Sequence, residues 1–258
     1  MKETNKKNIM KYINETDFFD DIILYDTVTS TNVVAKEFGV KGAKNGTVII
    51  SNQQTAGKGR LDRKFFSPPN SGIYMSIVLR LNLPINSVLL ITSAAAVAVY
   101  RAIKKVLNIE TQIKWVNDIY FNGKKLCGIL AESSLNSKGV DFIVLGIGLN
   151  LNNQDFPENI KNIVASLTTD KKNELIAEIL NQIYIIKDDL IKKDFINEYK
   201  MHSCIIGKDI NIIDKTGTKP AKAIDINENG HLVVLYDDKT IDTLSTGEIS
   251  IRLRNMAD

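Results

Sequence analysis

The pattern of apolar and polar positions over the first 200 residues predicts strands and helices in mixed order. Short β-branched or alternating runs are typical of strands, whereas longer runs with apolar residues every three or four positions are typical of helices. The pattern predicts strands at 22–28, 47–53, 72–81, 112–116, 119–133 and 142–152, and helices from 33 to Gly39, at 86–107 and at 171–200. We therefore expect a sheet with helices packed on it.

Three details sharpen this prediction. Residues 30–32 (STN) offer an N-cap for the first helix, since short polar side chains can accept the free N–H groups of its first turn. The helix at 86–107 is largely apolar through its Ala-rich middle, as expected of a helix buried against a sheet. The dipeptide Asn122-Gly123 predicts a hairpin turn.

The pattern changes after residue 204. Four short runs that fit strands follow one another, separated by turn residues such as Asn229-Gly230 and Asp237-Asp238. The runs lie at 208–214, 221–230, 231–237 and 239–245. This spacing predicts a small all-β module, barrel-like in form, behind the larger domain.

Composition and charge are those of an ordinary globular protein. Of 258 residues 44% are apolar, and a formal net charge of +3 gives no reason to expect bulk nucleic-acid binding. The most apolar run, 87–100, is shorter than the ~20 residues that cross a bilayer, and the N-terminus shows no signal-peptide pattern. Cys127 and Cys204 lack metal-site spacing. We therefore expect a cytoplasmic protein without a membrane segment or a structural metal site.

One stretch between two predicted strands combines flexibility with positive charge. Residues 53–64 read QQTAGKGRLDRK and hold two glycines and four basic side chains, with almost no apolar residue to anchor them. Taken alone, this composition fits a solvated surface turn as well as a loop that binds an anion. Glycines let backbone N–H groups approach a phosphate closely, and arginine and lysine neutralise its charge.

Four separated segments favour the second interpretation when they are taken together and in order. The segments are STN at 30–32, GKGRLDRKFFSP at 57–68, KWVNDIYFNGKKLCGIL at 114–130 and GIGLNLN at 146–152. Together they resemble the biotin protein ligases over about residues 30–152. The resemblance implies an α+β fold with two parts: a mixed-sheet catalytic domain of the biotin/lipoate ligase type at 1–204 and a small SH3-like β-barrel at 205–258.

The resemblance also implies a two-step reaction on biotin and ATP, with Mg²⁺ accompanying the ATP. The biotin carboxylate attacks the α-phosphate to give biotinyl-5′-AMP and pyrophosphate. A lysine of a biotin carboxyl carrier protein or domain then takes the biotinyl group. Two anions must be brought together against their repulsion, so we expect catalysis by positioning and electrostatics without a protein nucleophile.

The family pattern gives roles to residues of these segments. For biotin it implies Ser30, Thr31, Asn32, Gln54, Gly57, Arg60, Lys125 and Gly128. For ATP and the adenylate it implies Lys58, Gly59, Arg60, Arg63, Phe65, Asn117, Asp118 and Asn150. As catalytic residues it implies Lys125, Arg60 and Asp118.

These residue types suit the ligands. Hydroxyl and amide groups can supply the donors and acceptors that the ureido ring of biotin demands. The resemblance implies that Lys125 lies near the biotin carboxylate and the α-phosphate, and Asp118 near the phosphates or Mg²⁺. We expect the loop to be mobile when empty and to close over the adenylate, which would keep water off the anhydride.

Several residues also have an ordinary structural explanation. Residues 30–32 can simply cap a helix, and Lys125, like Lys124, can be a solvent-facing strand residue. For Trp115 we favour core packing over ligand contact, and Cys127 is expected to be a small buried hydrophobe. Outside the motifs lie His202 and His231, which we expect to be structural or exposed.

Three positions depart from the family pattern. Asp62 stands where a glycine is usual, which predicts a tighter turn or a left-handed aspartate. Phe65 replaces a common tryptophan and should still stack on adenine with less area. Val116 replaces the proline of KWPND, a change we expect to be tolerated.

Alternative functions are weaker matches to the sequence. Lipoate–protein ligases share the fold and the adenylation chemistry, but typically carry an RRxSGGG-type loop where this chain has AGKGR. A ligase with a winged-helix DNA-binding domain needs more room than the residues ahead of Ser30 give, so we expect no DNA binding. A pure biotin-binding protein would not need the basic loop. Some family members dimerise through the catalytic sheet, so a homodimer is compatible with the sequence.

Overall fold

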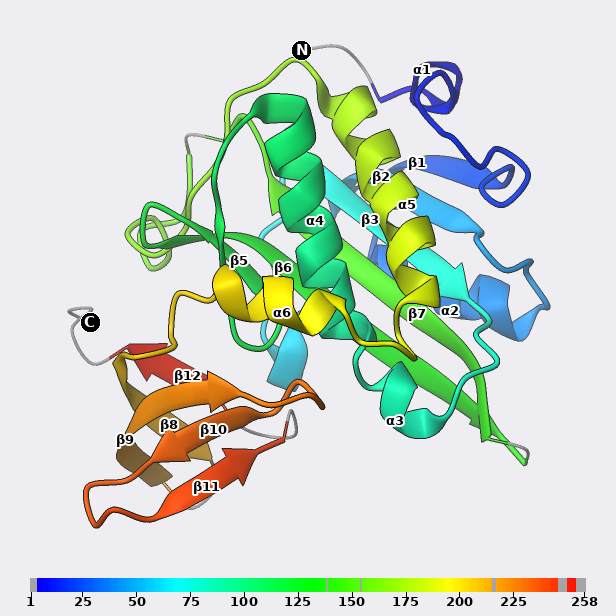
Figure 1. Ribbon diagram of the computed structural model, residues 1–258. Coiled ribbons are helices and arrows are strands. Elements are labelled where there is room, and N and C mark those ends of the chain that lie inside the picture. The colour runs from blue at the N-terminus through cyan, green and yellow to red at the C-terminus, as the bar shows by residue number, and fades with distance from the viewer. Residues whose placement is uncertain (1–3, 138, 154, 215–216, 246–249, 254–258) are drawn as a thin grey trace.

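The computed structural model describes residues 4–137, 139–153, 155–214, 217–245 and 250–253. Its larger sheet has seven strands in the order β1-β2-β3-β7-β6-β5-β4 (Figure 1). Only β1 and β2 run parallel, so the sheet is mixed, as the sequence predicts. The strands are β1 Ile22–Val28, β2 Val48–Gln54, β3 Gly72–Leu79, β4 Gln112–Lys114, β5 Asp118–Phe121, β6 Lys124–Asn136 and β7 Gly139–Asn150.

Helices cover both faces of this sheet. α2 (Thr31–Val40) packs on one face and shares a small apolar cluster with β2, β3 and β7. α4 (Ile91–Leu107) and α5 (Lys172–Asp188) lie side by side across the other face and bury the larger core (Figure 1). α6 (Phe195–Met201) packs on α4, and α1 (Lys6–Met10) packs on α5.

The structure corrects two predicted helices. The segment 171–200 is not one helix, because Asp189 accepts hydrogen bonds from the backbone N–H groups of Asp194 at 3.3 Å and Phe195 at 2.8 Å. These bonds stabilise a turn between α5 and α6. The helix predicted at 86–107 is likewise interrupted, with a short α3 (Ile85–Val88) before α4 begins at Ile91.

The predicted hairpin at Asn122-Gly123 is confirmed, whereas the predicted ends of α2 need correction. Both residues of the hairpin turn have the positive φ values (49° and 74°) that a tight turn between β5 and β6 requires. Ser30 stands at the N-cap of α2, but its side chain makes no capping hydrogen bond. α2 also continues through Gly39. A Cβ there would lie 2.4 Å from the Phe142 ring, so the glycine serves helix–sheet packing and does not end the helix.

The C-terminal strands form a separate antiparallel sheet in the order β11-β10-β9-β8-β12 (Figure 1). This sheet confirms the predicted all-β module and, with the mixed sheet, the α+β class. The proposed boundary after residue 204 lies between α6 and β8. The strands are β8 Asp209–Asp214, β9 Gly217–Ile226, β10 Leu232–Leu235, β11 Ile241–Leu244 and β12 Ser250–Leu253.

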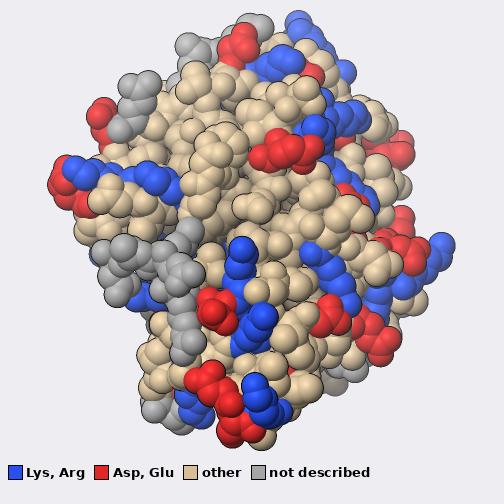
Figure 2. Space-filling view, turned by 60° about the vertical axis from the view of Figure 1, so that its left-hand side comes forward, with Lys and Arg blue, Asp and Glu red and all other residues tan. Residues whose placement is uncertain are grey.

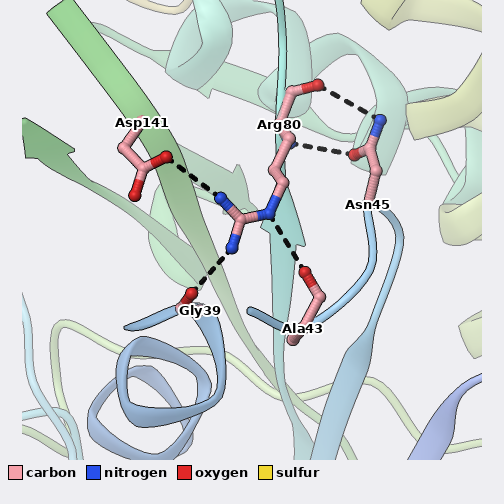
Figure 3. A network of polar contacts seen from close by, with 5 residues as sticks. All are labelled: Gly39, Ala43, Asn45, Arg80 and Asp141. Carbon is pink, nitrogen blue, oxygen red and sulfur yellow. Dashed lines mark hydrogen bonds and ion pairs between the residues drawn. The ribbon is translucent and has the colours of Figure 1, made fainter. Parts of the chain in front are cut away.

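Arg80, just after β3, fixes the C-terminal end of α2 (Figure 3). Its guanidinium donates to Gly39 O at 2.7 Å and to Ala43 O at 3.0 Å, and it pairs with Asp141 at 3.2 Å. Gly39 lies in the last turn of α2 and Ala43 just beyond it, so the cation adds a donor and a positive charge where the helix ends. The contacts hold α2 in place on the sheet, and the N-terminal end of α2 carries residues 30–32.

The surface carries charges of both signs. Figure 2 shows acidic and basic side chains interspersed on the face that it draws, around a broad area of uncharged residues. Within the described ranges, no helix is both long enough and apolar enough to cross a membrane.

Candidate functional site

The polar residues at the start of α2 form a hydrogen-bonded network with the end of β2. Gln54 Oε1 accepts from Thr31 N at 2.8 Å and from Thr31 Oγ1 at 3.2 Å. On its other side, Gln54 Nε2 donates to Ser67 Oγ at 2.9 Å. Ser30 and Thr31 are both buried. The amide of Gln54 is therefore oriented from both ends, and it joins α2 to the end of the basic loop.

Asn32 extends this network toward β6. Its Oδ1 accepts from Ser76 Oγ at 2.6 Å, and its Nδ2 donates to Glu132 Oε2 at 2.7 Å. Ser76 is fully buried, and its hydroxyl oxygen also lies 2.8 Å from Thr31 Oγ1. Ser76 and Glu132 are not among the site residues predicted from the sequence. The available signals were a serine between Met75 and Ile77 in the mostly apolar run of β3 and an acid directly after the apolar run of β6.

Three glycines of β6 and β7, namely Gly128, Gly148 and Gly146, form a strip of bare backbone beside this network, which we call the glycine row. Gly128 pairs with Gly148, and Gly146 lies two residues along β7. A Cβ at Gly146 would lie 2.1 Å from Asn32 Oδ1, and one at Gly148 would lie 2.7 Å from the Phe65 ring. At Gly128 the nearest atoms would be those of Lys125 and Phe65. The row therefore lets side chains lie directly on strand backbone, from the amide of Asn32 to the amine of Lys125.

The basic loop closes on itself over the glycine row. Phe65 N donates to Gly57 O at 2.9 Å, and Gly59 N donates to Arg63 O at 2.7 Å. A Cβ at Gly57 would lie 2.5 Å from Phe65 O, so this position requires glycine. The left-handed residue of the turn is Leu61, with a φ of 55°, which corrects the expectation of a left-handed Asp62.

Arg60 reaches from the loop to the strand junction ahead of β5. Its Nη1 donates to Asn117 Oδ1 at 3.4 Å. Burial lowers the pKa of the guanidinium, and the nearby carboxylate of Asp118 opposes part of that shift. Arginine stays charged despite such a shift, so Arg60 presents a partly desolvated cation to the site. Lys58 and Arg63, by contrast, lie on the exposed side of the loop.

Lys125 and Asp118 form an ion pair across the β5–β6 hairpin. The distance from Lys125 Nζ to Asp118 Oδ1 is 2.7 Å, and the side chains are 32% and 20% exposed. Lys125 is also fixed through its backbone, which exchanges hydrogen bonds with Ile163 and Ala165. Lys124 is exposed, as predicted. The two neighbouring lysines thus have different surroundings, and only Lys125 faces the glycine row.

Asn150 ends β7 and is 5% exposed. Its Nδ2 donates to Ala165 O at 3.1 Å, and its backbone oxygen accepts from Leu167 N. Since Ala165 also bonds Lys125, Asn150 and Lys125 are tied to the same segment, 163–167. A contact of the Asn150 side chain with adenylate stays a prediction.

Other residues singled out in the sequence have structural surroundings. Trp115 is 5% exposed in the core, and the Trp115–Val116 peptide bond is cis. Cys127 is fully buried, and burial raises the pKa of its thiol, which makes it unsuitable as a nucleophile. His202 stacks on Tyr100 with ring centroids 3.8 Å apart.

Among the described residues beside Lys125, the carboxylate that a divalent cation would meet is that of Asp118. The described residues contain no cluster of three or more potential metal ligands, and Asp118 already pairs with Lys125. Magnesium in nucleotide sites is commonly held by one or two carboxylates together with the phosphates and water. The residues therefore fit a cation that arrives with a triphosphate, not a resident metal centre.

A mixed seven-stranded sheet, a polar hydrogen-bonded network at the start of α2 and a basic loop are together typical of the biotin and lipoate ligases. Residues 24–150 match the Biotin/lipoate A/B protein ligase family, and residues 205–252 match the Biotin protein ligase C terminal domain. A Bacillus subtilis bifunctional ligase/repressor BirA is 32% identical over 223 residues, which is 83% of this chain and 69% of that protein. The chain belongs to the biotin protein ligases.

Further comparisons agree. A Mycobacterium tuberculosis biotin--[acetyl-CoA-carboxylase] ligase is 27% identical over 243 residues, covering 89% of this chain and 87% of that protein. Among solved structures, the biotin protein ligase from Aquifex aeolicus in complex with biotin and ATP is 26% identical, with a TM-score of 0.78. The match covers 91% of this chain and 100% of that chain.

Proposed function

We propose that this chain ligates biotin to a carrier-protein lysine in two ATP-dependent steps at the glycine row. The observation that carries the proposal is the order of groups along that row. The uncharged side chains of Asn32 and Thr31 lie at one end, where Asn32 also bonds the carboxylate of Glu132. The cations Lys125 and Arg60 lie toward the other end. Biotin has the same asymmetry, with a neutral ureido ring and a carboxylate separated by an apolar chain.

In the first step the cations bring two anions together. Lys125, fixed on β6, would stabilise the negative charge that builds at the α-phosphate as the biotin carboxylate attacks. Arg60 would grip the carboxylate end and the adjacent phosphate through paired hydrogen bonds. Lys58 and Arg63 would neutralise the outer phosphates, and Mg²⁺ bound with the triphosphate would add charge near Asp118.

Nucleotide binding requires the loop to change. The N–H of Gly59 is bonded to Arg63 O, so it can reach a phosphate only after that bond breaks. The Phe65 ring covers Gly148, where it would stack on adenine or cover biotin after rearrangement. Asn117 and Asn150 would contact the nucleotide from the strand ends. A loop that opens and closes would also keep water off the mixed anhydride.

In the second step a carrier lysine attacks the anhydride carbonyl and releases AMP. Asp118 would orient the attacking amine. The carrier can reach the site along β6, because from Leu130 to Asn136 this strand pairs only with β7 among the described residues. An open edge can accept a strand of another protein. A carrier domain or a second copy of the chain would fit there, and a homodimer is accordingly part of the proposal.

The direct test is to mix the protein with biotin, MgATP and a biotin carboxyl carrier domain and to weigh the carrier by mass spectrometry. We expect a gain of one biotinyl group that depends on ATP and on the acceptor lysine. Lipoate in place of biotin is the matched control, because relatives of this chain are named as biotin ligases. A carrier that gained lipoyl but no biotinyl groups would overturn the proposal in favour of a lipoate ligase.

A further inference from the structure

Asn117 and Asp118 end a short segment, 115–118, that several elements hold in place. Ile129 N donates to Asn117 O at 2.9 Å, and Asn117 Nδ2 donates to Ile129 O at 2.7 Å. From the other side, the hydroxyl of the fully buried Tyr199 donates to the carbonyl oxygen of the residue before Asn117 at 3.0 Å. Ile129 and Tyr199 both belong to the larger domain.

A third contact comes from the C-terminal sheet. Trp115 Nε1 donates to Gly230 O at 2.9 Å, and this bond is buried. Gly230 lies in the turn between β9 and β10 and is 115 residues further along the chain. The turn therefore reaches a side chain that stands three positions before Asp118.

The turn at 227–231 is held by its own hydrogen bonds and packs closely against the larger domain. Asn227 Oδ1 accepts from Asn229 N at 2.9 Å and from His231 N at 3.0 Å, and Gly230 N donates to Asn227 O at 2.9 Å. Gly230 has a φ of 71°, and a Cβ there would lie 2.9 Å from Leu90 Cδ2. Glycine avoids both the strain of the left-handed backbone and a close contact of a side chain with Leu90.

We propose that the turn at 227–231 is a positioning element of the adenylation site. Through Gly230 O it fixes the indole of Trp115, and through Trp115 it sets the place of Asn117 and Asp118. The proposal rests on the proposed function and assigns to the C-terminal sheet a part in the first step. If the indole shifts, Asp118 and its partner Lys125 shift with it, and a misplacement of about 1 Å can cost up to ~10²-fold in rate.

Two variants break the contact from opposite sides. Trp115→Phe keeps an aromatic ring but removes the N–H donor, and Gly230→Ala strains the turn and pushes it off Leu90. Gly207→Ala is the matched control. Gly207 also has a positive φ, of 80°, but a Cβ there would have nothing within 4 Å. Gly207→Ala therefore introduces the same kind of backbone strain but leaves the contact between Gly230 and Trp115 undisturbed.

We expect kcat for biotin-dependent pyrophosphate release to fall about tenfold in both test variants, with a much smaller change in the KM for biotin. The biotin network at Thr31 and Gln54 is built on other elements, so it should not respond. Gly207→Ala should keep the kcat of the parent protein. Thermal unfolding of all variants accompanies the kinetics, because a contact that only joins the domains would lower Tm and leave kcat alone.

Intrinsic fluorescence supplies a readout that does not need catalysis, since Trp115 is the only tryptophan. Gly230→Ala should shift its emission to the red and open it to an acrylamide quencher, and Gly207→Ala should do neither. Equal kcat and equal emission in these two variants would overturn the proposal, as would a Trp115→Phe protein with a lowered Tm and normal kcat. If the parent protein released no pyrophosphate, the proposed function would be wrong, and the fluorescence would still decide whether the turn holds the indole.

Discussion

Gly146 tests the orientation of Asn32 most directly. A Cβ at this position would lie 2.1 Å from Asn32 Oδ1, roughly 1 Å inside van der Waals contact. In Gly146→Ala the amide must therefore rotate away. It then loses its hydrogen bonds to Ser76 at 2.6 Å and to Glu132 at 2.7 Å.

The magnitude follows from those two bonds. A hydrogen bond to a neutral partner contributes about 0.5–1.5 kcal/mol and one to a charged partner about 1.5–3 kcal/mol, so the fold should lose about 2–4 kcal/mol. Biotin loses one oriented amide that faces its neutral ureido ring, which should cost about 0.5–1.5 kcal/mol of binding. That corresponds to a rise in Kd of about 2- to 13-fold. Calorimetric titration with biotin in the absence of ATP measures it.

A double-mutant cycle separates the orientation of Asn32 from a direct effect on the pocket. Asn32→Ala should weaken biotin binding by a similar factor and remove the atom that clashes with the new methyl group. Gly146→Ala should then add little in the Asn32→Ala background. If the losses of the two single variants simply add, Gly146 acts independently of Asn32 and the reasoning is refuted.

Three further predictions concern the cations and the loop. Lys125→Ala should slow pyrophosphate release by ~10²-fold, whereas Arg60→Ala should let the adenylate escape and label bystander lysines. A normal rate of pyrophosphate release in Lys125→Ala would contradict these roles, and so would an Arg60→Ala protein that neither forms pyrophosphate nor labels other lysines. Residues 55–66 should be cut readily by trypsin in the free protein and be protected by biotin with MgATP; equal cutting in both states would argue against gating. Arg80→Ala should lower the free energy of unfolding by about 2 kcal/mol in urea titrations, because the carbonyls of Gly39 and Ala43 lose a donor, and Arg80→Lys should restore only part of it; an unchanged midpoint would show that water replaces the guanidinium.

The sequence was sufficient for features that depend on local chemistry. The β-branched run that became β2, the run read as alternating that became β3 and the turn at Asn122-Gly123 each carry their own signal. Helix ends were harder to predict, because tertiary contacts decide them. Gly39 looks like a stop signal in the sequence, yet the Phe142 ring, about 100 residues away, fills the space that a side chain would need. The break between α5 and α6 depends on the carboxylate of Asp189, which the helical periodicity of 171–200 conceals.

The same distinction holds for the candidate site. Its residues in the loop and in the strand that holds Lys125 stand out because glycines and cations are rare together. Ser76 and Glu132 do not stand out, since a buried serine and an acid in a strand are common. Their importance comes from pairing with Asn32, and sequence spacing alone does not reveal a contact between residues 100 positions apart.

The geometry divides the site into two halves of different rigidity. The amides of Asn32 and Gln54 are oriented by neighbours on α2, β3 and β6 and by Ser67, so the polar site proposed for the ureido ring is in place before any ligand binds. In the loop, by contrast, the N–H of Gly59 already donates to Arg63 O, so it is not available to a phosphate. A preformed pocket loses little conformational entropy when it binds, whereas a loop that must first break its own bonds gives up part of the binding energy. Biotin should therefore bind the free protein more readily than ATP does, and the loop should rearrange when the second substrate supplies the phosphates.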